Sequence, residues 1–318
     1  MNSPARHAGL RVHRSNRVEV LAALLAAWIK ERHADGAVDP MQPDVVVVGN
    51  RGTERWLSHR LAEELGVCAH VEFPFPAGVV DRLVTWGCGG EARSATWSQD
   101  AVQWAILEEL EQLPAEPAWA ALVGWLQAEA RSTDRLIDRR RLGLAGQLAR
   151  VFDRLCTFRP EWMVAWSKAL PETPPPGVAA WQPALWQRLV HRLGPHHPAD
   201  RLVRALRQLR STAPGRMARR PPMPQLHLFG LSSLPPPYLE VLAAAGRHLD
   251  VDLYLLSPSD QYWADVRRGS VELPSPLVMA RDRLASRLEA VLPPDDPVLP
   301  GRTRPNPTLA TFGRIARD

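Results

Sequence analysis

The chain has 318 residues, of which 45% are hydrophobic and 23% are charged. These values are typical of a soluble globular protein with one large domain or about two ordinary ones. The longest apolar run, Val20–Ile29, is about half as long as a membrane-spanning helix needs to be. No stretch has the pattern of a secretory signal, so we expect a cytoplasmic protein without membrane contact.

The net charge is +5, and nearly all of the positive charge is arginine, because Lys30 and Lys168 are the only lysines. The guanidinium group suits phosphate and base contacts, since it bonds bidentately and stacks on rings. Arginine also replaces lysine in proteins from GC-rich genomes, so the charge leaves nucleic-acid binding and ordinary composition equally open. The three cysteines have neither zinc-site nor disulfide spacing, and we interpret them as buried or incidental thiols.

The first part of the chain alternates between strand and helix patterns. A short strand is predicted at residues 10–14 and a helix at 17–34. The unbroken apolar run DVVVVG at 44–49 predicts a strand buried on both faces, as in a parallel sheet covered by helices. The helix after it carries leucines at every fourth position, and Gly66 ends it. A proline-punctuated loop, FPFPAG, follows at 73–78.

From residue 98 to about 210 the pattern is almost entirely helical, with proline or glycine breaks, and most of the twelve tryptophans lie here. Such a stretch indicates a packed helical subdomain. Strand character returns at 226–230 and 251–256 with a helix between them, which is a βαβ unit. Residues 293–308 are proline-rich and are predicted to have little structure.

These patterns predict an α/β fold with one parallel sheet assembled from both ends of the chain and a large all-helical insertion. The expected domains are residues 1–96 and 216–318 as the two halves of the α/β domain, and 97–215 as the insertion. Discontinuous sheets of this kind recur among nucleotide-driven nucleic-acid motors.

A P-loop would need the pattern GxxxxGK[ST], whose amides, lysine and hydroxyl hold the phosphates and magnesium. The strand-to-helix turn GNRGTER at 49–55 has two glycines but no lysine, and the turn HRSNR at 13–17 has no glycine. Both lysines lie elsewhere, within or after helical sequence. No carboxylate ends an apolar strand in the manner of a Walker-B motif. We therefore predict that this chain does not hydrolyse ATP.

Nuclease chemistry would need converging carboxylates to hold magnesium. Asp295 and Asp296 lie in the proline-rich segment, and Asp81, Asp138 and Asp153 are scattered through helical sequence, where solvated or ion-paired roles are expected.

The histidine pair at 196–197 has no third metal ligand at helical spacing, so we expect it in a surface loop. The sequence GLSSL at 230–234 is not a nucleophile elbow. We therefore expect no catalytic site, cofactor or metal in this chain.

Two arginines stand out beside the second strand. Arg51 and Arg55 lie in and just after the loop at its carboxyl end, where ligands bind in open α/β sheets. A contact with DNA and an ordinary surface position are equally compatible with this placement.

Seven collinear blocks resemble the RecC family, the gamma subunits of exodeoxyribonuclease V. The family's opening is resembled by LRVHRSNRVEVLAALL (10–25), VVVVGNRGTERWLSHRLAEELGV (45–67) and VEFPFPA (71–77). The resemblance continues in ARVFDRLCTFRPEWMVAW (149–166), in AAWQPALWQRLV (179–190), in the block from LHLFGLSSLPPPYL onward (226–265) and in NPTLATFGRIARD (306–318).

This resemblance implies a fold, partners and an activity. Such subunits assemble with a RecB-type helicase–nuclease and a RecD-type helicase, which hold the ATP and magnesium. Their amino-terminal half is folded like a superfamily 1 helicase without its ATP site. They help to split duplex DNA ends and guide the 3′ strand past a site that senses Chi, during double-strand break repair by homologous recombination. Members are much longer, which implies that this chain is an amino-terminal fragment or a truncated product.

The resemblance also implies DNA-binding positions, which fall on Gly49, Arg51, Arg55, Phe75 and Asp81. The best-known enterobacterial member has Gln, Thr, Gln, Leu and Trp there, so all five positions depart. The chain then either reads a different sequence or lacks the sensing role. Arginine can contact guanine or phosphate, and phenylalanine can stack on a base or pack.

Three hypotheses follow. The first is a non-catalytic DNA-handling subunit of the helicase–nuclease. The second is an active ATPase or nuclease, and the third is an architectural partner-binding module without DNA contact.

Overall fold

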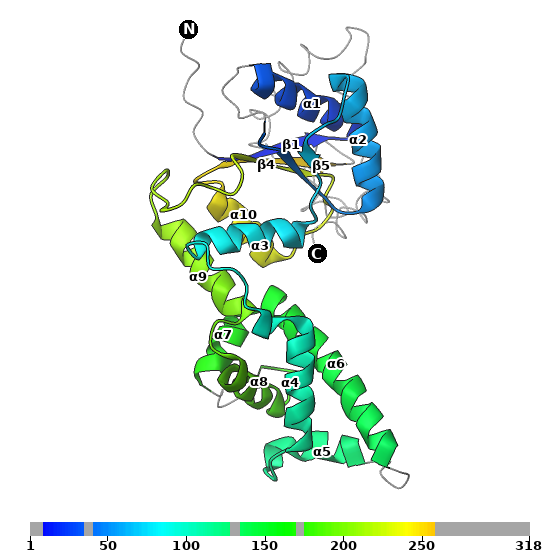
Figure 1. Cartoon of the computed structure of the whole chain (residues 1–318), viewed down its shortest axis with the longest axis vertical. Coiled ribbons are helices and arrows are strands. Elements are labelled where there is room, and N and C mark those ends of the chain that lie inside the picture. The colour runs from blue at the N-terminus through cyan, green and yellow to red at the C-terminus, as the bar shows by residue number, and fades with distance from the viewer. Residues whose placement is uncertain (1–8, 35–40, 128–133, 170–174, 258–318) are drawn as a thin grey trace, which may run out of the picture. The chain divides into compact units, whose positions relative to one another are not determined.

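The computed structural model describes residues 9–34, 41–127, 134–169 and 175–257, and the chain forms two compact units (Figure 1). The first unit contains Met1–Val80, Met223–Leu234 and Ala245–Asp318, and the second contains Asp81–Pro222 and Pro235–Ala244. The expected domain boundaries after residues 96 and 215 stay predictions, while the compact units divide the chain after Val80 and Pro222. The proline-rich segment 293–308 lies outside the described residues.

The first unit contains a five-stranded sheet in which every neighbouring pair is parallel. Its strands are β1 (Leu10–Ser15), β2 (Asp44–Val48), β3 (Val71–Glu72), β4 (Gln225–Phe229) and β5 (Asp250–Leu256). Their order across the sheet is β1-β5-β4-β2-β3. The predicted α/β class with a parallel sheet is therefore confirmed.

The strand order explains why both ends of the chain are needed. The strands β5 and β4 lie between β1 and β2, so the amino-terminal strands alone do not form a continuous sheet. The helix α10 (Pro236–Ala245) connects β4 to the parallel β5, as the predicted βαβ unit requires. The two-residue strand β3 was not predicted, because it is too short to show a pattern.

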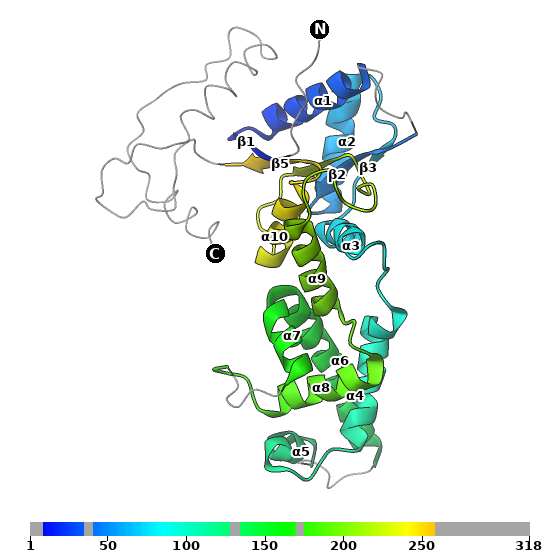
Figure 2. The same ribbon diagram turned by 90° about the vertical axis from the view of Figure 1, so that its left-hand side faces the viewer.

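One face of the sheet is covered by two helices of the same unit, α1 (Val18–Ala34) and α2 (Arg51–Leu65), which lie on the same side in both views (Figures 1 and 2). Their leucines pack with Val46, Val48, Phe229 and Tyr254, which alternate along β2, β4 and β5 toward this face. The intervening valines of β2 are also buried, as the unbroken apolar run predicted. The strand and the helix on either side of the β2–α2 junction are therefore both packed into the core of the first unit.

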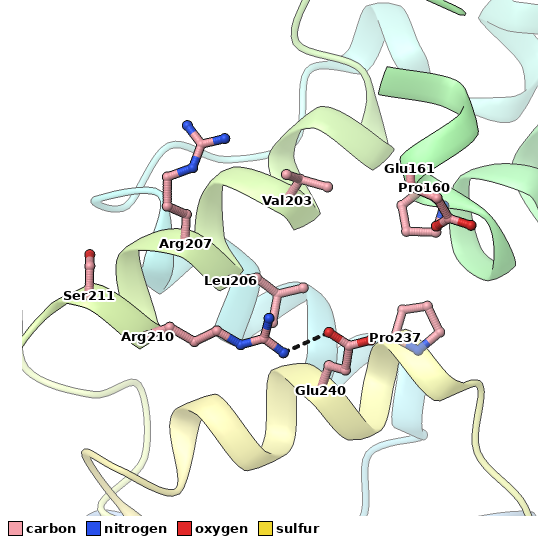
Figure 3. A pocket seen from close by; sticks show the side chains of 9 residues that line it. All are labelled: Pro160, Glu161, Val203, Leu206, Arg207, Arg210, Ser211, Pro237 and Glu240. Carbon is pink, nitrogen blue, oxygen red and sulfur yellow. Dashed lines mark hydrogen bonds and ion pairs between the residues drawn. The ribbon is translucent and has the colours of Figure 1, made fainter. Parts of the chain in front are cut away.

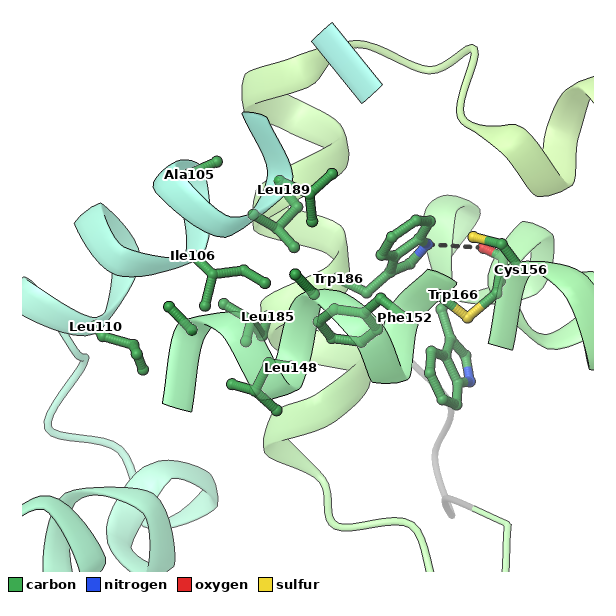
Figure 4. Close-up of a cluster of buried hydrophobic side chains, with 14 of the residues drawn as sticks. Ala105, Ile106, Leu110, Leu148, Phe152, Cys156, Trp166, Leu185, Trp186 and Leu189 are labelled. Atoms are coloured by element: carbon green, nitrogen blue, oxygen red, sulfur yellow. Dashed lines mark hydrogen bonds between the residues drawn. The ribbon is translucent and has the colours of Figure 1, made fainter. Parts of the chain in front are cut away.

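In its described residues the second unit is helical. It contains most of α3 (Pro76–Gly87), which begins before the division at Val80, together with α4 (Gln99–Glu111), α5 (Ala120–Gln127), α6 (Asp134–Phe158), α7 (Pro160–Lys168), α8 (Trp181–Leu193), α9 (Pro198–Ser211) and α10, with short 3-10 turns at Ala95–Trp97 and Pro117–Trp119. Figure 4 shows Phe152 of α6 beside Trp186 and Leu185 of α8 in its core. The buried Trp186 indole donates a hydrogen bond to the carbonyl oxygen of Met163 at 2.9 Å. Several tryptophans here are thus core residues.

The expectation of a surface loop is wrong for His197, whose side chain is buried. His197 is the N-cap of α9, and its Nδ1 accepts a hydrogen bond from the Asp200 amide at 3.2 Å. The side chain is held inside because it satisfies an amide that the helix leaves without a partner. Its neighbour His196 is exposed.

Within the described ranges, no helix combines the length and the apolar character needed to cross a membrane.

Candidate nucleic-acid interface

The junction between β2 and α2 is short. The strand ends at Val48 and the helix begins at Arg51, so only Gly49 and Asn50 connect them. A P-loop wraps a phosphate in a loop of several residues between its two glycines. Here the second glycine, Gly52, already lies in the first turn of α2, so no such loop forms.

The side chain of Asn50 closes the start of α2. Its Oδ1 accepts hydrogen bonds from the Thr53 amide at 2.9 Å and the Thr53 hydroxyl at 3.3 Å. A Cβ at Gly52 would lie 3.1 Å from this oxygen, so the glycine leaves room for the cap. An amide that would otherwise face an anion is therefore satisfied by the protein itself.

The lysines lie far from this junction along the chain. Lys30 is exposed on α1, twelve residues after the helix begins, which is roughly 18 Å along its axis. Lys168 is exposed at the end of α7 in the second unit. Because α1 begins beyond the carboxyl end of β1, Lys30 lies toward the opposite edge of the sheet.

The buried acid of β5 has a structural role. Asp252 is fully buried and accepts hydrogen bonds from Arg11 Nε at 2.7 Å, from Arg11 Nη2 at 2.8 Å and from Gln225 at 2.9 Å. It lies 2.8 Å from His13 Nε2. Burial alone would raise the pKa of Asp252, but the bonds from Arg11 and His13 outweigh burial and hold it well below its ordinary value.

A second buried acid, Asp44, lies at the amino end of β2. Arg32 Nη1 donates to it at 2.7 Å and His33 Nε2 lies 2.8 Å away. Both buried acids are therefore already paired, and Asp44 lies at the sheet edge opposite the β2–α2 junction. Neither takes the position of a Walker-B carboxylate, which ends its strand.

Two sequence-predicted residues are brought into contact at the carboxyl end of β2. The Val48 amide donates to the Pro74 carbonyl at 3.2 Å, which attaches the FPFP loop to the end of the strand. As a result the guanidinium carbon of Arg51 lies 5.3 Å from the centre of the Phe75 ring. Arg51 also pairs with Glu54 at 2.7 Å, within the first turn of α2.

Arg55 and Gly49 complete the same region. Arg55 follows Arg51 by four residues on α2, so the two side chains lie on one face of the helix. Gly49, Arg51, Arg55 and Phe75 are all exposed, and we call these four residues the strand-end surface. Within the described part of the chain no ion pair is found for Arg55. The surface therefore offers an uncommitted guanidinium and an exposed aromatic ring.

The fifth predicted residue, Asp81, belongs to the second unit. Its exposed carboxylate lies 3.7 Å from Nη1 of the buried Arg201 on α9. The carboxylate of Asp81 is therefore near a positively charged side chain of the protein itself and needs no nucleic-acid ligand to explain its position.

The remaining candidates give no catalytic cluster. Among the residues that the structure describes, no group of three or more His, Cys, Asp or Glu side chains is arranged to hold a metal. Asp153 is exposed and lies 4.0 Å from Arg93. Cys156 is buried, and burial raises the pKa of its thiol to about 12, which leaves it unreactive.

Two features were missed in the sequence. The capping role of Asn50 has a visible signal, because Asn followed three residues later by Thr precedes a helical pattern. The second is the arginine content of residues 201–220, which carry seven arginines and no acidic residue.

Comparison with known proteins gives one consistent family. The family described as "RecC, N-terminal domain" matches residues 10–318. The protein described as RecBCD enzyme subunit RecC in Mycolicibacterium smegmatis is 34% identical over 314 residues, which are 94% of this chain and 27% of that protein. Its counterpart in Escherichia coli is 28% identical over 266 residues, which are 81% of this chain and 22% of that protein.

A third relative with the same description, from Haemophilus influenzae, is 24% identical over 284 residues, covering 80% of this chain and 24% of that protein. The chain thus spans about a quarter of the length of the curated relatives it matches.

Proposed function

The chain belongs to the RecC family, matching its amino-terminal domain, and from this membership we propose that it is a non-catalytic, DNA-handling part of a RecBCD-type enzyme. Its partners in this proposal are a RecB-type helicase–nuclease and a RecD-type helicase, which supply ATP hydrolysis and magnesium. The names of the relatives support the assembly, since each is described as a subunit of the RecBCD enzyme.

The observation that carries the proposal is the β2–α2 junction. A parallel sheet with this strand-to-helix turn supports a superfamily 1 helicase-like origin, since such motors bind nucleotide at this edge. In this chain the Asn50 cap occupies the start of the helix and no lysine stands in the turn. The junction carries Arg51, Arg55 and Phe75 instead, which are chemically suited to a strand of DNA.

In this proposal the strand-end surface contacts the unwound 3′ strand during repair of double-strand breaks. Arg51 and Arg55 bind phosphate or a guanine edge, and Phe75 stacks on a base. The same surface would take part in sensing Chi, with a preference set by the arginines.

The direct test measures the affinity of the chain for oligothymidylate over a range of salt concentrations. For a single strand, each lost phosphate contact lowers the salt slope by about 0.7, so we expect the double variant Arg51→Ala/Arg55→Ala to lose about 1.4. The matched control is Arg139→Ala/Arg247→Ala, which removes the same charge from two exposed positions outside this surface. Equal slopes for the two double variants would favour an architectural module without strand contact.

A second measurement tests whether the chain binds or hydrolyses ATP. We expect no ATP turnover and no magnesium-dependent ATP binding by the purified chain. The Asn50 side chain accepts from a helix amide that could otherwise bind phosphate, and the turn has no lysine to bind the phosphate oxygens. Turnover by the chain alone would overturn the non-catalytic role.

A further inference from the structure

The segment with the highest density of positive charge lies outside the strand-end surface. Residues 201–220 form most of α9 and the connector after it, and they contain seven arginines and no acidic residue. All of them belong to the second unit. The roles of these arginines divide into two groups.

Three of the seven have structural partners. The buried Arg201 donates to the Glu91 carbonyl at 2.7 Å. Arg204 pairs with Glu91 at 3.1 Å and with Asp200 at 2.9 Å. These contacts hold the loop after α3 against α9.

The third is Arg210, which pairs with Glu240 of α10 at 2.6 Å (Figure 3). In the same view the Arg207 side chain extends away from this pair.

The other four, Arg207, Arg216, Arg219 and Arg220, are exposed, and no acidic partner is found for them among the described residues. Exposed unpaired arginines close together repel one another, so their concentration in one segment favours a bound polyanion.

Two of these arginines line a common cavity. A hollow of about 350 Å³ is bounded by Arg204, Arg207 and Arg219, together with the end of α3 and the residues after it (Trp86–Gly89). No acidic side chain lines it. The Arg204 Nη2 is buried and has no hydrogen-bond partner in the structure. The cavity therefore has three guanidinium groups in its wall and one donor still unsatisfied.

Close backbone packing builds this wall. Gly87 lies against Ala205, where an added Cβ would be 2.8 Å from the Ala205 Cβ and 3.0 Å from its Cα. Gly90, with φ of +90°, lies under the Arg219 guanidinium, which occupies the space that a side chain at position 90 would need. The Trp86 indole donates to the Arg219 carbonyl at 2.9 Å. These contacts position Arg219 next to α9.

We propose that Arg207 and Arg219, together with Arg204 of the same cavity wall, form a second DNA contact that binds the phosphodiester backbone. Guanidinium groups grip phosphate oxygens bidentately, and charge-assisted bonds of this kind are the strong ones. An exposed aromatic ring is not among the residues that line the cavity, so the contact reads no sequence. This contact lies in the second unit and is independent of the strand-end surface.

The test compares Arg207→Ala/Arg219→Ala with the control Arg139→Ala/Arg247→Ala, using the whole chain with oligothymidylate and with a duplex. We expect the salt slope for the single strand to fall by about 1.4 in the first variant and to change much less in the control. The variant Arg207→Lys/Arg219→Lys keeps the charge and should retain most of the slope. Thermal midpoints measured alongside identify any variant that fails to fold, and the single variant Arg207→Ala, at an exposed position of α9, then carries the comparison with an expected fall of about 0.7 in the slope.

Slopes equal to the control with both DNAs would overturn the proposal. If slopes stay unchanged while binding to a RecB-type subunit is lost, the arginines form a protein interface and the DNA contact is refuted. A loss of slope in Arg207→Ala/Arg219→Ala but not in Arg51→Ala/Arg55→Ala would support this contact and count against the strand-end surface. A loss of slope in Arg51→Ala/Arg55→Ala but not in Arg207→Ala/Arg219→Ala would support the strand-end surface and count against this second contact.

Discussion

The guanidinium of Arg51 lies over the ring of Phe75, 5.3 Å from its centre, although the two residues come from different elements. An exposed contact of this kind contributes about 0.5–1 kcal/mol, and the exposed pair between Arg51 and Glu54 contributes little. Both Arg51 and Phe75 can therefore exchange these partners for a nucleotide at small cost. The strand-end surface is therefore ordered, and its present contacts are weak enough to be replaced by contacts with DNA.

The first prediction concerns Phe75, whose side chain is 40% exposed. If Phe75 stacks on a base, Phe75→Ala should lose about 1–3 kcal/mol of binding free energy to single-stranded DNA. That loss corresponds to roughly a 5- to 150-fold weaker Kd. Fluorescence anisotropy with a labelled oligothymidylate measures it.

Two variants make this prediction specific. Phe75→Trp should retain the affinity, because the larger ring also stacks. Trp104→Ala, which removes an exposed aromatic side chain from α4, should leave the affinity within experimental error. If Phe75→Ala binds as tightly as the unchanged chain, Phe75 only packs against Arg51.

How much of this arrangement the sequence predicts depends on the range of the contacts. The buried run Val45–Val48 and the helix that Gly66 ends follow local periodicity, and both appear at the predicted positions. The approach of Phe75 to Arg51 depends on the hydrogen bond between Val48 and Pro74, which is a tertiary contact. No local pattern encodes such a contact, so the two residues can be identified from the sequence but their pairing cannot.

The buried His197 and the cavity of Arg204, Arg207 and Arg219 were missed for the same reason. A histidine before Pro198 reads locally as a turn, and only the packing of the helices buries it. The arginine density was visible, but which arginines are paired depends on acids from distant elements, such as Glu91 and Glu240.

The second prediction concerns the buried Asp252. Asp252→Asn removes the charge that Arg11 compensates and changes the group that faces His13 Nε2. We expect a loss of about 3 kcal/mol in the free energy of unfolding, at the low end for breaking a buried pair, because Arg11 is partly solvated. Denaturant unfolding measures the loss. Asp153→Asn, at an exposed position, should change stability by no more than about 0.5 kcal/mol; similar values for both variants would remove the structural role of Asp252.

The third prediction uses two glycines of the second unit. Gly87→Ala places a Cβ 3.0 Å from the Ala205 backbone, so α3 and α9 must separate. We expect a loss of about 1–3 kcal/mol in unfolding free energy, as for other overpacked sites. Gly143→Ala on α6 meets nothing within 4 Å and should instead stabilise by up to about 1 kcal/mol, since alanine favours the helix. Thermal unfolding compares the two; equal effects would show that the close approach at Gly87 carries no constraint.

The fourth prediction is a pH dependence that comes from His197. Burial lowers the pKa of His197 from 6.5 to about 4. Its Nδ1 accepts from the Asp200 amide, so Nε2 carries the proton and donates to the Ser167 hydroxyl at 2.7 Å. A second proton on the ring would occupy Nδ1 and leave the Asp200 amide without its acceptor. The folded state therefore favours the neutral ring.

The sign follows from proton binding. Between pH 6.5 and 4 the unfolded chain binds the proton and the folded chain does not, so this stability is fully present above pH 6.5 and is lost as the pH falls toward 4. The shift corresponds to about 3 kcal/mol at most. His197→Asn keeps an N-cap acceptor that does not titrate, so its unfolding free energy should fall less steeply over this range. The control His191→Asn alters an exposed histidine of α8 and should follow the unchanged chain. Parallel curves for His197→Asn and the unchanged chain would mean that the titration of His197 does not contribute to the pH dependence of stability.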